Sequence, residues 1–150
     1  MSEPIDEITD FLVRATGALG LSLTTAVEPL DDGWWIDLQG EGGEALLRRR
    51  GEALTALQHI VEAAYRRQLG GKRLHLDCLG FRKDKEAELR QMAKYLAGRA
   101  KETGVDQQIG PLNPYERRLV HLEIAEDSGV TSESIGDAHM KTVIISVQKP

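Results

Sequence analysis

Three consecutive arginines followed by a glycine, Arg48–Gly51, form the densest positive charge in the sequence. Planar guanidinium groups bind phosphate oxygens, and a glycine lets a backbone approach a phosphate closely. The ordinary alternative is a solvated helix face, but three consecutive side chains cannot all pair along one face of a helix. We therefore expect Arg48, Arg49, Arg50 and Gly51 to contact a polyanion.

A second arginine stands four residues before a histidine, at Arg117 and His121. Side chains four apart share one face of a helix, where a guanidinium fork and a ring N–H could contact phosphate together. The same spacing also occurs by chance. The alternative is a surface salt bridge for Arg117 and a satisfied, partly buried His121.

The distribution of charge favours a polyanionic partner despite the net charge of −5. Residues 1–47 carry a net charge of −9 and residues 119–150 carry −3, whereas residues 48–118 carry +7. A basic stretch of this kind is the electrostatic footprint of a nucleic-acid binder, and acidic ends limit indiscriminate binding.

Catalytic and metal-binding patterns are missing from the sequence. The four histidines have no companion at zinc-ligand spacing, and no phosphate-binding glycine loop or nucleophile motif occurs. The single cysteine, Cys78, lies in an alternating segment and is expected to be a small buried apolar residue. We expect no enzyme activity, no metal and no cofactor.

The first residues are acidic, and no apolar run approaches the roughly 20 residues that span a bilayer. We expect a cytoplasmic protein without direct membrane insertion.

Hydrophobic periodicity and turn residues divide the chain into helices and strands. The first half predicts a helix over 3–19, two antiparallel strands over 21–27 and 34–38, a helical turn at 44–47, a helix over 52–67 and a strand over 73–79. The second half predicts a helix over 83–102, a short strand over 105–109, a helix over 114–126, and strands over 130–135 and 142–147. Asn113, Pro114 and Glu116 together form a strong helix-start signal.

The motifs in this order resemble a known family. The segment around Arg48–Gly51 resembles the G-x-x-G loop between two helices of the KH nucleic-acid-binding domain, with Arg48 in place of the first glycine. The helix with Arg117 and His121 resembles the R-three-H domain of single-stranded nucleic-acid-binding proteins. Together with the join at 76–82, the segment 111–121 and the closing strand at 143–145, they resemble the bacterial Jag family over nearly the whole chain.

This resemblance implies an α+β protein of two small domains. A KH-like domain (helix-strand-strand-helix-helix-strand) would cover 1–79, and an R-three-H-like domain (helix-strand-helix-strand-strand) would cover 80–150. The implied function is non-catalytic RNA binding in the cytoplasm, in post-transcriptional regulation. The resemblance also implies that Arg118, Tyr115, Arg82 and Lys141 line the binding surface.

The expected partners are single-stranded RNA or single-stranded DNA, and a protein such as a small KH protein. The alternative is a protein-interaction adaptor, linked to membrane protein insertion or control of cell growth, in which KH binding has weakened. The substitution of Arg48 for glycine and the net charge of −5 motivate this alternative.

Overall fold

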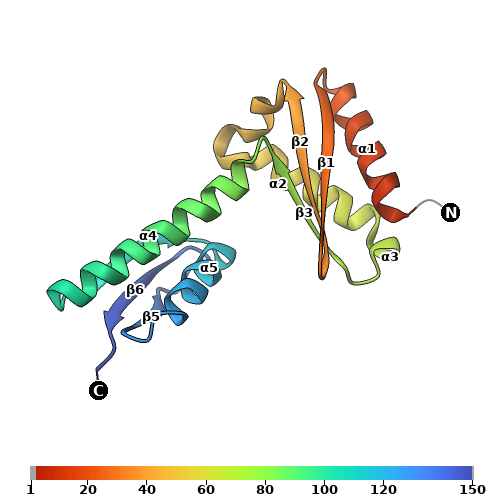
Figure 1. Cartoon of the computed structure of the whole chain (residues 1–150). Coiled ribbons are helices and arrows are strands. Elements are labelled where there is room, and N and C mark those ends of the chain that lie inside the picture. The colour runs from red at the N-terminus through yellow and green to blue at the C-terminus, as the bar shows by residue number, and fades with distance from the viewer. Residues whose placement is uncertain (1–2, 150) are drawn as a thin grey trace. The chain divides into compact units, whose positions relative to one another are not determined.

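The computed structural model describes residues 3–149, which divide into two compact units, one ending at Lys83 and the other starting at Asp84. Each unit contains a three-stranded sheet and packed helices (Figure 1). The predicted α+β class is confirmed, and so is the predicted order of helices and strands.

The first unit follows the predicted order of helices and strands. Its elements are α1 (Pro4–Ala18), β1 (Ser22–Leu30), β2 (Gly33–Glu41), the 3-10 helix η1 (Gly43–Leu47), α2 (Arg48–Ala64), α3 (Arg66–Leu69) and β3 (Arg73–Cys78). In the sheet order β1-β2-β3, β1 and β2 are antiparallel and β2 and β3 are parallel. A parallel neighbour requires a long crossover connection, which η1, α2 and α3 supply.

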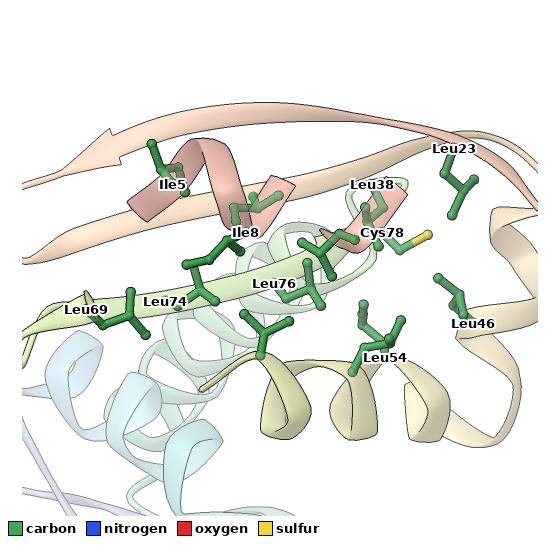
Figure 2. Close-up of a cluster of buried hydrophobic side chains, with 14 residues drawn as sticks. Ile5, Ile8, Leu23, Leu38, Leu46, Leu54, Leu69, Leu74, Leu76 and Cys78 are labelled. Carbon is green, nitrogen blue, oxygen red and sulfur yellow. The ribbon is translucent and has the colours of Figure 1, made fainter. Parts of the chain in front are cut away.

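The core of the first unit forms where apolar faces of helix and strand meet. Ile5, Ile8 and Leu12 recur at helical spacing on α1, and alternate residues of β2 and β3 point to the same side. Figure 2 shows side chains from α1, the strands and α2 meeting in one cluster. This packing fixes α2, and with it the arginine-rich segment at its start.

The predicted helix over 52–67 is interrupted near its end. α2 stops at Ala64, Tyr65 leaves helical geometry, and the short α3 follows. The strands β1 and β2 are longer than predicted because they pair along their whole length, from Ser22↔Glu41 to Leu30↔Gly33. Pairing extends them through residues that lack a clear alternation.

The second unit takes most of α4 (Phe81–Thr103), whose first turn lies in the first unit. It continues with β4 (Gln107–Leu112), α5 (Pro114–Ala125), β5 (Val130–Ile135) and β6 (Lys141–Val147). β6 lies at the centre of an antiparallel sheet of order β4-β6-β5. Alanines of α4 pack with apolar side chains of α5, β5 and β6 in a separate core.

The prediction for β4 was wrong at both ends, since the strand covers 107–112 rather than 105–109. Gly110 and Pro111 lie within it, at a register shift between Ile109 and Leu112. Proline and glycine usually indicate the end of a strand but also occur at such irregularities on edge strands. Within residues 3–149, no helix is both long and apolar enough to cross a membrane.

Candidate nucleic-acid interface

The arginine-rich loop breaks the helix that contains it. Arg49, Arg50 and Gly51 have φ values of 53°, 61° and 76°, so three consecutive residues adopt left-handed backbone geometry inside α2. This conformation costs a non-glycine residue roughly 1–2 kcal/mol. The three arginines are exposed and Gly51 is buried.

Arg48 stands where the G-x-x-G pattern has its first glycine, and the backbone there does not require a glycine. Arg48 has φ −60° and ψ 147°, an extended geometry that any residue adopts. Glycine at this position would therefore change charge and side-chain size, with no backbone strain to relieve. At Gly51, by contrast, φ of 76° requires left-handed geometry, and an added Cβ would meet Phe81 Cε1 at an ordinary 3.6 Å.

The positive charges of the three arginine side chains remain largely accessible to a ligand. Arg49 Nη1 lies 3.9 Å from Glu52 Oε2, and both side chains are mostly exposed. Such surface pairs contribute little and are screened by salt. Regular helical geometry resumes at Glu52, so the first N–H groups of that helix lie directly after the loop.

Arg82 lies in the first turn of α4 and is engaged with the protein itself. Its Nη1 donates to the Leu76 carbonyl at 2.7 Å and to Gln58 Oε1 at 2.5 Å, and its Nη2 donates to Thr55 Oγ1 at 3.0 Å. The structure therefore places Arg82 between α2 and β3, in the same unit as the arginine-rich loop.

In the second unit, Arg117 connects two loops. Its Nη1 donates to the Leu112 carbonyl at 2.7 Å and to the His139 carbonyl at 2.8 Å. The first bond joins the end of β4 to α5, and the second joins the connection between β5 and β6. Arg117 is half-buried, so holding these loops is one of its roles.

His121 lies one turn further along α5 and contacts two serines of β5. Its Nδ1 is 2.6 Å from Ser132 Oγ and its Nε2 is 2.8 Å from Ser134 Oγ. Burial of the ring, and secondarily the charge of Arg117, lowers the pKa of His121 below its ordinary value. The ring is therefore neutral at pH 7, with one nitrogen donating and the other accepting.

The remaining predicted residues of the second unit differ in their surroundings. Arg118 is exposed on α5, and Lys141 is half-buried at the start of β6. The Tyr115 hydroxyl donates to Glu86 of α4, and the residue is 47% exposed. The structure thus divides the predicted site into Arg48–Gly51 with Arg82 in one unit and the other five residues in the second.

Several neighbouring residues were not predicted from the sequence. Ser132 and Ser134 stand two apart on a strand, which puts them on one face, but their pairing with His121 depends on tertiary packing. Gln58 of α2 bonds to β3 across 16 residues. Arg66, Lys72 and Arg73 belong to basic clusters visible in the sequence, and they line a cavity of about 650 Å³ beside α2 and β3.

Two further expectations from the sequence concern metal ligands and Cys78. Residues 3–149 contain no group of three or more potential metal ligands. Cys78 is buried, as predicted, and burial, with the nearby carboxylates of Asp37, Asp77 and Glu44, raises its pKa to about 11.

Comparison with known proteins gives a consistent set of similarities. A family model of the R-three-H domain matches residues 87–147. "RNA-binding protein KhpB" of Clostridium symbiosum is 28% identical over 147 residues, which is 96% of this chain and 66% of that protein. Proteins of the same name from Lactiplantibacillus plantarum and Bacillus subtilis are 27% and 26% identical, over 95% and 96% of this chain.

The chain spans 66%, 44% and 71% of the lengths of these three relatives. The similarity nevertheless runs over nearly all of the chain itself. The family resemblance predicted from the sequence is therefore confirmed.

Proposed function

We propose that this homologue of Jag-family proteins named RNA-binding protein KhpB binds single-stranded RNA, without catalysis, through two sites on its two units. The observation that carries the proposal is the exposed, strained arginine loop at Arg48–Gly51. Backbone strain persists only where the surrounding structure enforces it, and it clusters at ligand-binding positions. We infer that this strain holds three guanidinium groups at the start of a helix.

The first site captures phosphates. The guanidinium groups of Arg48, Arg49 and Arg50 supply charge-assisted hydrogen bonds, and the helix that resumes at Glu52 supplies free N–H groups and the positive end of its dipole. The second glycine of the loop is retained at Gly51. Arg48 replaces the first glycine by an additional cation in extended geometry, which compensates for less close backbone approach.

The cavity beside α2 and β3 extends this site. Arg66, Lys72 and Arg73 line it, with Glu62 as the acidic member. Cations that line a hollow raise the local concentration of a polyanion. In this proposal the RNA backbone follows the cations and the bases enter the cavity.

The second site lies on α5 and β5. Ser132 and Ser134 present hydroxyls on either side of His121, and Arg118 and Lys141 supply charge nearby on α5 and β6. Arg117 holds the loops that frame this surface through the Leu112 and His139 carbonyls. We propose that Arg117 acts both by positioning these loops and by its charge.

The test is fluorescence anisotropy of labelled single-stranded RNA, single-stranded DNA and duplex RNA at two salt concentrations. Wild type should bind single strands and lose affinity steeply as salt rises, because each neutralised phosphate releases counterions. The double variant Arg117→Ala, His121→Ala should weaken binding broadly across sequences. Unchanged affinity in that variant would remove the second site.

Arg48→Gly separates RNA binding from the adaptor alternative. Arg48 is already in extended geometry, so glycine relieves no strain and removes one charge. We expect the variant to bind more weakly than wild type. Binding by the variant but not by wild type would mean that Arg48 disables the loop, and the adaptor would then be the better interpretation.

A further inference from the structure

The outer edge of β3 is covered by side chains. β3 pairs with β2 along one edge only, and a free edge exposes backbone N–H and C=O groups that bind other chains or ligands. Here four consecutive outward groups are occupied: the Leu74 carbonyl and Leu76 N–H by Gln58, the Leu76 carbonyl by Arg82, and the Cys78 N–H by Asp77.

Gln58 occupies the part of this edge nearest the cavity. Its Nε2 donates to the Leu74 carbonyl at 3.1 Å, and its Oε1 accepts from the Leu76 N–H at 3.2 Å. The amide N–H and the amide oxygen of Gln58 thus pair with a carbonyl and an N–H that lie next to each other on the strand edge. Every nucleobase carries the same adjacent pair of groups on its pairing edge.

The surroundings hold the Gln58 amide in place and leave it accessible. Its second N–H donates to Glu62 at 2.9 Å, and its oxygen also accepts from Arg82. Gln58, Glu62 and Leu74 all line the basic cavity of about 650 Å³. A molecule in the cavity would therefore meet the amide and the strand edge together.

The other two covering side chains are tied to α4. Asp77 is fully buried and accepts from the Arg82 and Lys83 N–H groups at the start of α4. Arg82 makes three hydrogen bonds across α2 and β3. Movement of Gln58 alone frees two backbone groups, which suit one base and are too few for an added strand.

We propose that the Gln58 amide is a built-in stand-in for a nucleobase, and that a base of the bound RNA displaces it from Leu74 and Leu76. This inference rests on the proposed RNA binding and names a base-reading position within it. The basic lining of the cavity favours a nucleic acid over a peptide. Each RNA binding event then breaks two hydrogen bonds to Gln58 before it forms two to the base.

Removal of the amide should therefore strengthen binding. A net hydrogen bond corresponds to roughly a 2-fold to 12-fold change in an equilibrium constant. Gln58→Ala should tighten the binding of oligouridine by about 5-fold. An abasic oligonucleotide of the same length and charge has no base edge, so its affinity should not change.

The matched control is Gln91→Ala, which removes an exposed glutamine from α4 in the other unit. This variant should bind both oligonucleotides as wild type does. Nuclear magnetic resonance of wild type supplies an independent readout. On addition of oligouridine, the Gln58 side-chain N–H signals should move to exposed values while the Leu76 N–H stays protected from exchange.

The possible outcomes separate the two proposals. Three results would overturn the role of Gln58 and leave RNA binding standing. Gln58→Ala could bind oligouridine as tightly as wild type, it could bind more weakly, or it could gain equally for the abasic probe. Self-association of the variant would also overturn it, because Gln58 would then shield the edge from other strands. If neither protein bound any oligonucleotide, RNA binding would be wrong and this inference with it.

Discussion

Arg50 and Gly51 have nearly the same backbone geometry but different tolerance for it. Glycine adopts φ of 76° freely, whereas arginine at φ of 61° is strained. Gly51→Ala should destabilise the first unit slightly, because about 1–2 kcal/mol of left-handed strain exceeds the roughly 0.5–1 kcal/mol of chain entropy that alanine spares on folding. The added Cβ would make only ordinary contact with Phe81, so the effect would come from the backbone. Denaturant unfolding measures it, and an unchanged midpoint would contradict the left-handed geometry.

Arg50→Gly should act in opposite directions on stability and on binding. Relief of about 1–2 kcal/mol of strain exceeds the roughly 0.5–1 kcal/mol of extra chain entropy that glycine loses on folding, so the variant should be slightly more stable. RNA affinity should fall because one charge is lost. Arg50→Ala is the matched control: it loses the same charge, keeps the strain and should not gain stability. If both variants had equal stability, strain would not be stored at this residue.

His121 links protonation to folding in the second unit. Because its pKa is lowered in the folded state, the unfolded chain takes up the proton first as pH falls. The stabilising contribution of the neutral ring is complete above the ordinary pKa of 6.5 and is lost as pH falls from there towards the folded value. Arg117→Gln should raise the pKa of His121 and leave it below 6.5, since burial is the larger cause. A ring-proton titration by nuclear magnetic resonance would detect this, and an unmoved pKa would exclude the influence of Arg117.

Among the helices and strands, features that depend on nearby residues were predicted, including the antiparallel pairing of β1 with β2, whereas contacts between more distant segments were not. The start of α5 is confirmed in detail: Asn113 Oδ1 accepts from the Glu116 N–H at 2.8 Å, and Glu116 Oε1 accepts from the Asn113 N–H at 3.1 Å. All the residues of that signal are neighbours in the chain. The parallel pairing of β3 with β2, and the side chains that cover the outer edge of β3, depend on residues far apart in sequence.

The candidate site divides in the same way. Charge and glycine position were sufficient to single out the loop at Arg48–Gly51, because these properties are local. Spacing on a helix correctly put Arg117 and His121 on one face. It could not reveal that Arg117 bonds to a carbonyl 22 residues away, or that two serines of β5 contact the His121 ring.

The capping box of α5 provides a test at this scale. Asn113→Ala removes the acceptor for the Glu116 N–H and should destabilise the second unit by about 1 kcal/mol. Glu116→Gln is the matched control, because an amide oxygen can still accept from the Asn113 N–H. Its effect should be much smaller. Thermal unfolding followed by circular dichroism compares the two, and equal losses would mean that the charge of Glu116, rather than the hydrogen bond, starts the helix.

At the scale of the whole molecule, both units contribute cations to an acidic protein. The net positive region 48–118 includes the arginine-rich loop of the first unit and α4 with the start of α5 in the second. A single chain in which both units contact one RNA gains affinity from the high effective concentration of the second site. Salt dependence should therefore report phosphate contacts from both units together.

The slope of log affinity against log salt counts these contacts, at roughly 0.7 per neutralised phosphate of a single strand. Replacing Arg48, Arg49 and Arg50 together by glutamine should reduce the steepness of that slope by about 2. Arg14→Gln, which removes an exposed arginine on α1 paired with Asp10, is the control for net charge and should leave the slope unchanged. If Arg14→Gln and Arg49→Gln reduced the slope equally, RNA affinity would depend only on the net charge of the protein. A selective effect of the loop arginines would instead indicate direct phosphate contact by these exposed guanidinium groups.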